Sequence, residues 1–246
     1  MGTVLTLKKP LDTLLDLEPL SALTETDADA IAAVALRYGR HTPAAGELFE
    51  IKRTDKNGLT LRGDLRLAVN VGAGMEGGRI RAESSVGDGA GARMRGGELR
   101  VCGGAGRNAC AELQNGFVLI EQNAADGLAR CVRRGTIVVG GAAEGEVCAG
   151  LRGGTVLLLG GAADESRLAR GMCRGTILLP AGTRAPDGFR LAADVDLVFL
   201  RLLFLRLRER GVSVPEGWNG GTFTRFVGDA AGLGKGELFV FSEAGV

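Results

Sequence analysis

The hexapeptide Met75-Glu76-Gly77-Gly78-Arg79-Ile80 decides the fold, because near-copies of it follow at a constant spacing. Each of the next four copies begins 19 residues after the one before, and a sixth begins 21 residues after the fifth. The later copies are Met94-Arg95-Gly96-Gly97-Glu98-Leu99, Leu113-Gln114-Asn115-Gly116-Phe117-Val118, Val132-Arg133-Arg134-Gly135-Thr136-Ile137, Leu151-Arg152-Gly153-Gly154-Thr155-Val156 and Met172-Cys173-Arg174-Gly175-Thr176-Ile177. A repeat of this length with a short β-branched run in each copy is typical of a solenoid. We therefore predict a mainly β fold, a right-handed β-helix with coils of about 19 residues.

One position of the repeat is always glycine. This structural glycine column consists of Gly78, Gly97, Gly116, Gly135, Gly154 and Gly175. A corner of a coil needs either a positive φ or close approach of stacked backbones, and glycine meets both needs at the lowest cost. A second set of corners, Gly72, Gly91, Cys110, Ala129 and Cys148, includes residues other than glycine. We expect the conformational requirement to be weaker there.

The strand of each copy has two apolar positions, which are Ile80 and Ala82 in the first copy. Alternate residues of a strand share a face, so both positions point into the coil. The outward position between them is Arg81 in the first copy and Arg100 in the second. In the later copies it is Leu119, Val138, Leu157 and Leu178. A stacked apolar stripe on the outside of a solenoid has to be covered.

Residues 194–210 are apolar nearly all round, and this segment is too short and too rich in arginine to span a membrane. We expect it to form a helix that packs on the apolar stripe and turns its other flank to a second protein. The candidate partner-interface residues are therefore Leu119, Val138, Leu157, Leu178, Phe199 and Phe204.

The flanks of the repeat predict two smaller parts. Residues 3–7 and 46–52 predict strands, residues 26–38 a helix, and residues 55–58 a turn. Beyond the helix at 194–210, residues 222–226 and 237–241 predict strands around a glycine-rich loop. We expect an N-terminal α/β capping module over residues 1–55, a β-helix over 56–187, and a C-terminal helix and capping segment over 188–246.

The composition excludes several classes of protein. A net charge of +1 over 246 residues argues against nucleic-acid binding, which needs clustered positive charge. The first residues predict a strand rather than a signal peptide, and no segment predicts a membrane span. Five cysteines without a CxxC pair indicate free thiols in a reducing compartment. We expect a cytoplasmic protein.

Residues with catalytic potential are few and scattered. His41 is the sole histidine, and neither serine nor cysteine stands in a nucleophile motif. The GxGxxG match at residues 72–77 precedes another strand rather than the helix that a dinucleotide site requires. Asp229 and Glu237 flank the C-terminal glycine-rich loop and are the best polar candidates, although turn chemistry explains Asp229 equally well. We predict no catalytic residue, no metal ligand and no cofactor for this chain.

Arginines recur at one corner of the coils. Arg95, Arg133 and Arg152 share a repeat position, and Arg134 and Arg174 share the next. This ladder has two interpretations: a solvated face, or contacts to a polyanion such as a polyglutamate chain.

Three stretches together resemble a known family: GELFEI at residues 46–51, the repeated MxGGxIxV coils, and FxGD…GKGE at residues 226–237. They are similar to the β-helical subunit of formylmethanofuran dehydrogenase, and more so to its counterpart in the bacterial formyltransferase/hydrolase complex. The coils alone also resemble the GXGXG domain of glutamate synthase. The likeness covers roughly residues 1–241, although Asn115 and Arg134 depart from the glycine pair.

The resemblance implies a β-helical subunit that docks two enzymes, one amidohydrolase-like and one a formyltransferase, with a molybdopterin-type subunit as a further partner. Such a complex moves a formyl group between tetrahydromethanopterin and a methanofuran-type polyglutamate carrier and releases formate. The resemblance places the metal, the formyl carriers and the acid–base residues in partner subunits. Three functions follow: a non-catalytic scaffold of the hydrolase complex, the corresponding subunit of a molybdenum or tungsten formylmethanofuran dehydrogenase, or a glutamate-synthase-type spacer domain.

Overall fold

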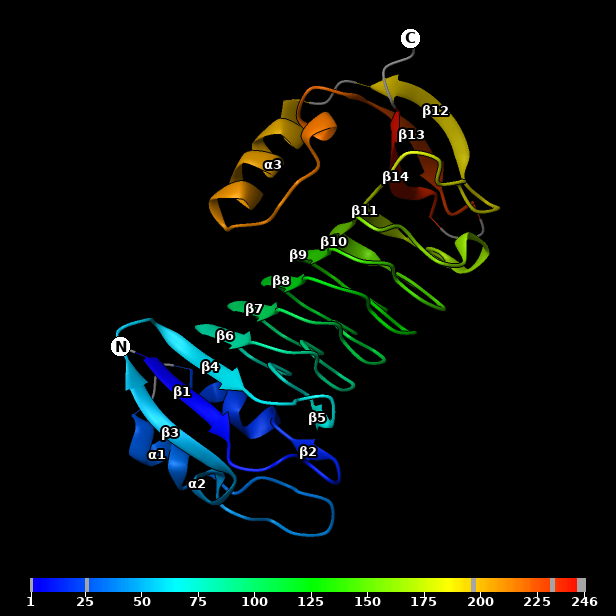
Figure 1. The fold of residues 1–246 in the computed structure, drawn as a ribbon. Helices are drawn as coiled ribbons and strands as arrows, with labels where there is room; N and C mark the ends of the chain where they lie inside the picture. The colour runs from blue at the N-terminus through cyan, green and yellow to red at the C-terminus, as the bar shows by residue number, and fades with distance from the viewer. Residues whose placement is uncertain (1, 25–26, 196–197, 231–232, 243–246) are drawn as a thin grey trace.

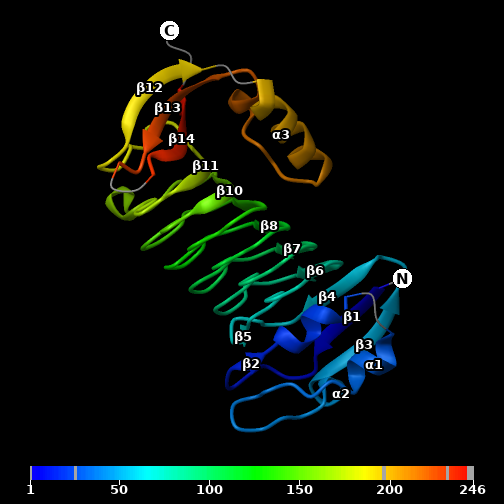
Figure 2. The same ribbon diagram turned by 180° about the vertical axis from the view of Figure 1, so that it is seen from behind.

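The computed structural model describes residues 2–24, 27–195, 198–230 and 233–242. It is mainly β, with one long, mixed, largely parallel sheet and few helices, as Figure 1 shows. This confirms the predicted fold class. A stack of short strands joins an N-terminal module to a C-terminal module, and Figure 2 shows the same stack from behind.

The N-terminal module combines short strands with short helices. Its elements are β1 (Gly2–Leu7), β2 (Leu15–Asp16), η1 (Glu18–Ala22), α1 (Ala28–Ala32), α2 (Ala45–Leu48), β3 (Phe49–Thr54), β4 (Gly58–Arg62) and β5 (Ala68–Val69). β1 lies between β4, which runs parallel to it, and β3, which runs antiparallel. Through β4 the module continues directly into the stack.

The central stack consists of one short strand from each repeat. These strands are β6 (Arg79–Ala82), β7 (Glu98–Val101), β8 (Phe117–Ile120), β9 (Thr136–Val139), β10 (Arg152–Leu158) and β11 (Arg174–Leu179). Each pairs in parallel with the next, so that Ile80 lies beside Leu99 and Leu99 beside Val118. A second row of parallel bridges joins Val86, Ala105, Ala124, Ala143 and Ala162 at the same 19-residue spacing.

The C-terminal module extends the same sheet. It contains η2 (Glu165–Arg167), β12 (Arg190–Val195), α3 (Val198–Glu209), η3 (Glu216–Asn219), β13 (Thr222–Gly228) and β14 (Lys235–Ser242). β14 pairs in parallel with β11, and β13 and β12 follow as antiparallel neighbours. Twelve strands of the described chain thus form one sheet, in the order β12-β13-β14-β11-β10-β9-β8-β7-β6-β4-β1-β3.

The inward positions of the strands form a continuous core. Ile80, Leu99, Val118, Ile137 and Val156 are at most 2% exposed and belong to one hydrophobic cluster that runs the length of the stack. Each coil buries its apolar residues against the coils above and below it. Folding of one coil therefore depends on its neighbours.

The glycine column has the geometry that a corner demands. All six members have positive φ, between 74° at Gly78 and 116° at Gly175. A Cβ at Gly97 or Gly135 would also lie 2.7 Å from a carbonyl oxygen of the preceding coil. Left-handed backbone and close stacking occur together here, so a larger residue would be strained for two reasons.

The second set of corners corrects the expectation of a weaker requirement. Cys110, Ala129 and Cys148 have φ of 58°, 56° and 58°, close to the 71° of Gly72 and the 66° of Gly91. The left-handed conformation is thus kept where glycine is absent. These residues bear a conformational cost that glycine avoids.

Two helix predictions were wrong in extent. The helix predicted over residues 26–38 is the five-residue α1, capped by the Asp27 carboxylate, which accepts from Ala28 N. Residue 26 lies outside the described residues. After α1 the chain is held by antiparallel bridges between Ala35 and Ala44 and between Tyr38 and His41. The helix predicted over residues 194–210 begins at Val198, because the preceding residues pair with β13 as β12.

Two of the predicted strands also differ at their starts. Residues 46–48, predicted as the beginning of a strand, belong to α2, and the Glu47 carboxylate accepts from Ala44 N at 2.9 Å. The strand β3 follows at Phe49. The predicted strands at 3–7, 222–226 and 237–241 are present as β1, β13 and β14.

Candidate functional site: the outward faces of the stack

The outward position of the stack changes from basic to apolar along the sheet. Arg81 lies beside Arg100, and Arg100 beside Leu119, in parallel register. The apolar residues continue through Val138 to Leu157 and Leu178, and Phe239 of β14 lies beside Leu178. An unbroken apolar stripe therefore covers the outer face at the C-terminal half.

This stripe is covered by the chain itself. α3 turns Leu200, Phe204 and Leu207 toward it, and these side chains share one cluster with Phe117, Leu119, Val138, Leu157 and Leu178. In both ribbon views α3 lies beside the β8–β11 end of the sheet (Figures 1 and 2). Trp218, Phe223 and Phe241 close the cluster with ring-to-ring contacts, of which the shortest, Phe223 to Phe241, has centroids 5.4 Å apart. α3 ends before Gly211, whose left-handed φ of 72° stops the helix.

The burial changes which residues can meet a partner. Val138, Leu157, Leu178 and Phe204 are 0% exposed, and Leu119 is 5% exposed. As partner-interface candidates these five are corrected, because the chain's own helix and C-terminal strands already occupy them. Phe199 is 48% exposed, although its ring also meets Phe239 edge-on.

A second apolar face lies on the opposite side of α3. Val198, Leu202 and Leu205 are 68%, 58% and 55% exposed, and with Phe199 they follow one another at helical spacing. Three such exposed aliphatic side chains on one helix are unusual for a surface that faces water alone. This outer face of α3 is the candidate partner surface.

The arginines of the ladder lie at the start of the strands. Arg95 forms an ion pair with Glu76 at 2.7 Å, so it is already neutralised. Arg133, Arg134, Arg152 and Arg174 are exposed, and within the described residues none of their guanidinium groups has an ion pair or hydrogen bond. The structure thus separates Arg95 from the other four.

The remaining polar candidates serve local structure. The Asp229 carboxylate accepts from Gly171 N at 3.0 Å, and Glu237 accepts from the Arg225 guanidinium at 2.6 Å. His41 is exposed and forms a backbone bridge with Tyr38. Gly72 and Gly74 occupy left-handed corners of the stack, and no helix follows them in the described part of the chain before η2.

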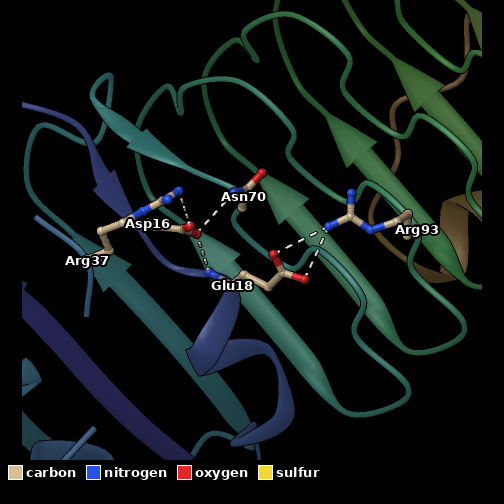
Figure 3. A network of polar contacts seen from close by, with 5 residues as sticks. All are labelled: Asp16, Glu18, Arg37, Asn70 and Arg93. Carbon is tan, nitrogen blue, oxygen red and sulfur yellow. Dashed lines mark hydrogen bonds and ion pairs between the residues drawn. The ribbon is translucent and has the colours of Figure 1, made fainter. Parts of the chain in front are cut away.

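A polar network at the N-terminal end was not found from the sequence. The Asp16 carboxylate accepts from Arg37 and from Asn70 Nδ2, each at 3.0 Å, and Glu18 pairs with Arg93 at 3.2 Å (Figure 3). These contacts join the N-terminal module to the first coils. Partners 54 and 75 residues apart in sequence gave no local signal of the pairing.

The five cysteines are all free thiols. Cys110 and Cys148 are buried, and burial raises the pKa of the Cys110 thiol to about 12 and that of Cys148 still further. Burial also raises the pKa of Cys102, a partly exposed thiol. Neutral thiols of this kind are poor nucleophiles and poor metal ligands.

Metal-binding groups and membrane spans are both absent from the described residues. These residues contain no group of three or more His, Cys, Asp or Glu side chains arranged to hold a metal ion. None of their helices is long and apolar enough to cross a membrane.

Comparison with known proteins gives one informative likeness. No protein-family model matches the chain, and no curated protein matches it. Among solved structures, the chain is similar to a chain in the crystal structure of the formyltransferase/hydrolase complex FhcABCD from Methylorubrum extorquens, in complex with methylofuran. The TM-score is 0.74 at 28% sequence identity, and the match covers 98% of this chain and all of the other. The chain is therefore similar, over nearly its whole length, to a component of a formyltransferase/hydrolase complex.

Proposed function

We propose that this chain is the β-helical subunit of a formyltransferase/hydrolase complex, where it serves as a non-catalytic scaffold. The observation that carries the proposal is the full-length likeness to a chain of FhcABCD, which leaves almost no residue of either chain unmatched. In this proposal the complex moves a formyl group between tetrahydromethanopterin and a methanofuran-type carrier and releases formate in the cytoplasm. The amidohydrolase-like and formyltransferase partners hold the reacting groups, the metal and the carrier.

The framework of such a scaffold is a right-handed β-helix over residues 56–187, between an N-terminal cap (1–55) and a C-terminal cap (188–246). Two features support this proposal: the strands β6 to β10 pair at a constant offset of 19 residues, and the bridges from Val86 to Ala162 repeat that offset on a second row. A stack of this kind keeps its two ends at a fixed distance, which suits a spacer between two active sites.

The outer face of α3 is the surface that we assign to a partner protein. Its inner residues are already buried, so the exposed Val198, Leu202 and Leu205 add nothing to the chain's own core. Burying them against a second protein would remove apolar area from water on a helix whose position is fixed from behind.

The test is co-purification of the chain with the amidohydrolase-like and formyltransferase partners after co-expression. The double variant Leu202→Glu/Leu205→Glu places two charges on the outer face of α3, and we expect it to fold normally and to lose a partner. Leu14→Glu is the matched control, because Leu14 is 55% exposed, like Leu205, but lies in the N-terminal module.

Two results would count against the assignment. If the double variant retains both partners as wild type does, α3 is not the docking surface. If wild type itself binds neither partner, the scaffold proposal fails as a whole.

A further inference from the structure

The stack carries a row of unpaired cations along one corner, which we call the basic edge. Its members are Arg130, Arg133, Arg134, Arg152, Arg170, Arg174 and Lys235, and all seven side chains are exposed. Within the described residues, none of these side chains forms an ion pair or a hydrogen bond. For a chain with a net charge of +1, this is a pronounced local concentration of positive charge.

The register of the strands brings these residues together. Arg152 lies beside Arg174, and Arg174 beside Lys235, on successive parallel strands. Arg152 N donates to Val132 O, which places Arg133 one coil below Arg152. At about 4.8 Å per strand, the three steps from Arg133 to Lys235 span roughly 14 Å.

Arg130 and Arg170 extend the row around the corner. The middle coil links them, since Cys131 N donates to Ala149 O and Gly150 N donates to Arg170 O. Two carboxylates border the edge. Glu112 lies one coil below Arg130, and Asp229 accepts from Gly171 N.

The same corner is neutralised in the earlier coils. There Arg93 pairs with Glu18 at 3.2 Å, Arg95 with Glu76 at 2.7 Å, and Arg79 approaches Glu98 at 3.7 Å. The later coils present the cations without the acids. Neighbouring like charges about 5 Å apart repel one another, and an anionic ligand that spans them relieves this repulsion.

We infer that the basic edge binds an extended chain of carboxylates. The planar fork of arginine pairs with a carboxylate through two parallel hydrogen bonds, and six of the seven cations are arginines. An exposed row several coils long fits a ligand that carries several negative charges in line. This inference goes beyond the scaffold role, and it is tested on the full chain without its partners, so its failure leaves the scaffold proposal intact.

The experiment measures binding of a fluorescent deca-glutamate peptide by anisotropy at low ionic strength. The triple variant Arg133→Gln/Arg134→Gln/Arg152→Gln removes three charges from the edge, and we expect its Kd to rise by about tenfold. The matched control Arg79→Gln/Arg93→Gln/Arg95→Gln removes three charges from the same corner where they are paired, and its Kd should change less than about threefold. Wild-type affinity should fall as salt rises, because screening weakens such contacts.

Thermal melts of both triple variants show whether each still folds, and deca-glutamine serves as the uncharged probe. Inorganic polyphosphate distinguishes the class of anion. Equal binding by wild type and the edge variant, an equal loss in the control, or tighter binding of polyphosphate than of deca-glutamate would each overturn the inference.

Discussion

Single residues at the corners determine how tightly the coils stack. The glycine column combines positive φ with close backbone approach, and it is glycine in all six repeats. The second column keeps the same left-handed conformation with Cys110, Ala129 and Cys148. The two columns differ in the space beside the residue rather than in the backbone. The second column therefore tolerates a Cβ, at the cost of strain.

This difference predicts that Ala129→Gly stabilises the chain. Ala129 has a φ of 56°, and glycine relieves a strain of about 1–2 kcal/mol, of which about 0.4–1 kcal/mol is offset by the greater freedom of the unfolded chain. We expect a net gain of about 0.5–1 kcal/mol in urea unfolding.

The control is Ala124→Gly, at a buried bridge position without positive φ. It should destabilise the chain by about 1 kcal/mol. If both variants destabilise the chain equally, the left-handed strain at Ala129 is absent.

Buried thiols give a second prediction at this scale. Cys110 and Cys148 are 0% exposed and burial raises the pKa of both, so they should label only after unfolding, whereas the partly exposed Cys131 and Cys173 should label in the folded chain at pH 8. Because the folded pKa is raised, their contribution to stability is complete below the ordinary value of 9.0 and is lost as the pH rises toward 12.

The measurement is mass spectrometry of iodoacetamide-treated protein, with and without urea. Native labelling of Cys110 or Cys148 at the rate of Cys173 would show that the corner is open.

At the scale of elements, α3 and the apolar stripe depend on each other. The stripe on β8 to β11 is buried because α3 and the C-terminal strands cover it, and the inner side of α3 is ordered against that stripe. The sequence predicted this pairing because the outward position turns from arginine to leucine and valine midway along the repeat. It did not predict the start of α3, since pairing of β12 with β13 is a tertiary contact that competes with local helix propensity.

Leu157→Arg tests this pairing. Leu157 is 0% exposed in the centre of the stripe, so a buried charge should cost several kcal/mol and lower the free energy of unfolding accordingly. Arg81→Leu, on the exposed basic part of the same outward row, should change it by less than about 0.5 kcal/mol. Chemical denaturation of both variants decides the matter. Equal stability of Leu157→Arg and wild type would mean that α3 does not cover the stripe.

At the scale of the whole molecule, the repeat made most of the fold predictable. A fixed spacing transfers the assignment of one coil to all the others, which is why the strands from β6 to β11 and their shared inward face could be named in advance. The N-terminal helix was overestimated because bridges such as Tyr38 to His41 connect residues that local patterns treat as helical.

The candidate site was less predictable than the fold. The sequence identified the outward row and the arginines, but it could not show that α3 would occupy Leu157 and Leu178 itself and leave Leu202 and Leu205 exposed. It also could not separate Arg95, which pairs with Glu76, from Arg133, which is unpaired within the described residues. Both distinctions depend on contacts between residues that are far apart in the sequence or on neighbouring coils.

The central claim is that this chain is a scaffold that belongs to a formyltransferase/hydrolase complex. The most direct test is affinity purification of the tagged chain at native expression level, followed by mass spectrometry of the assembly and a formyl-transfer assay. We predict recovery with amidohydrolase-like and formyltransferase partners in fixed stoichiometry, and activity that resides in the assembly and is lacking in the chain alone. Recovery of the chain by itself, or formyl transfer by the partner-free chain that a point substitution in it abolishes, would contradict the account.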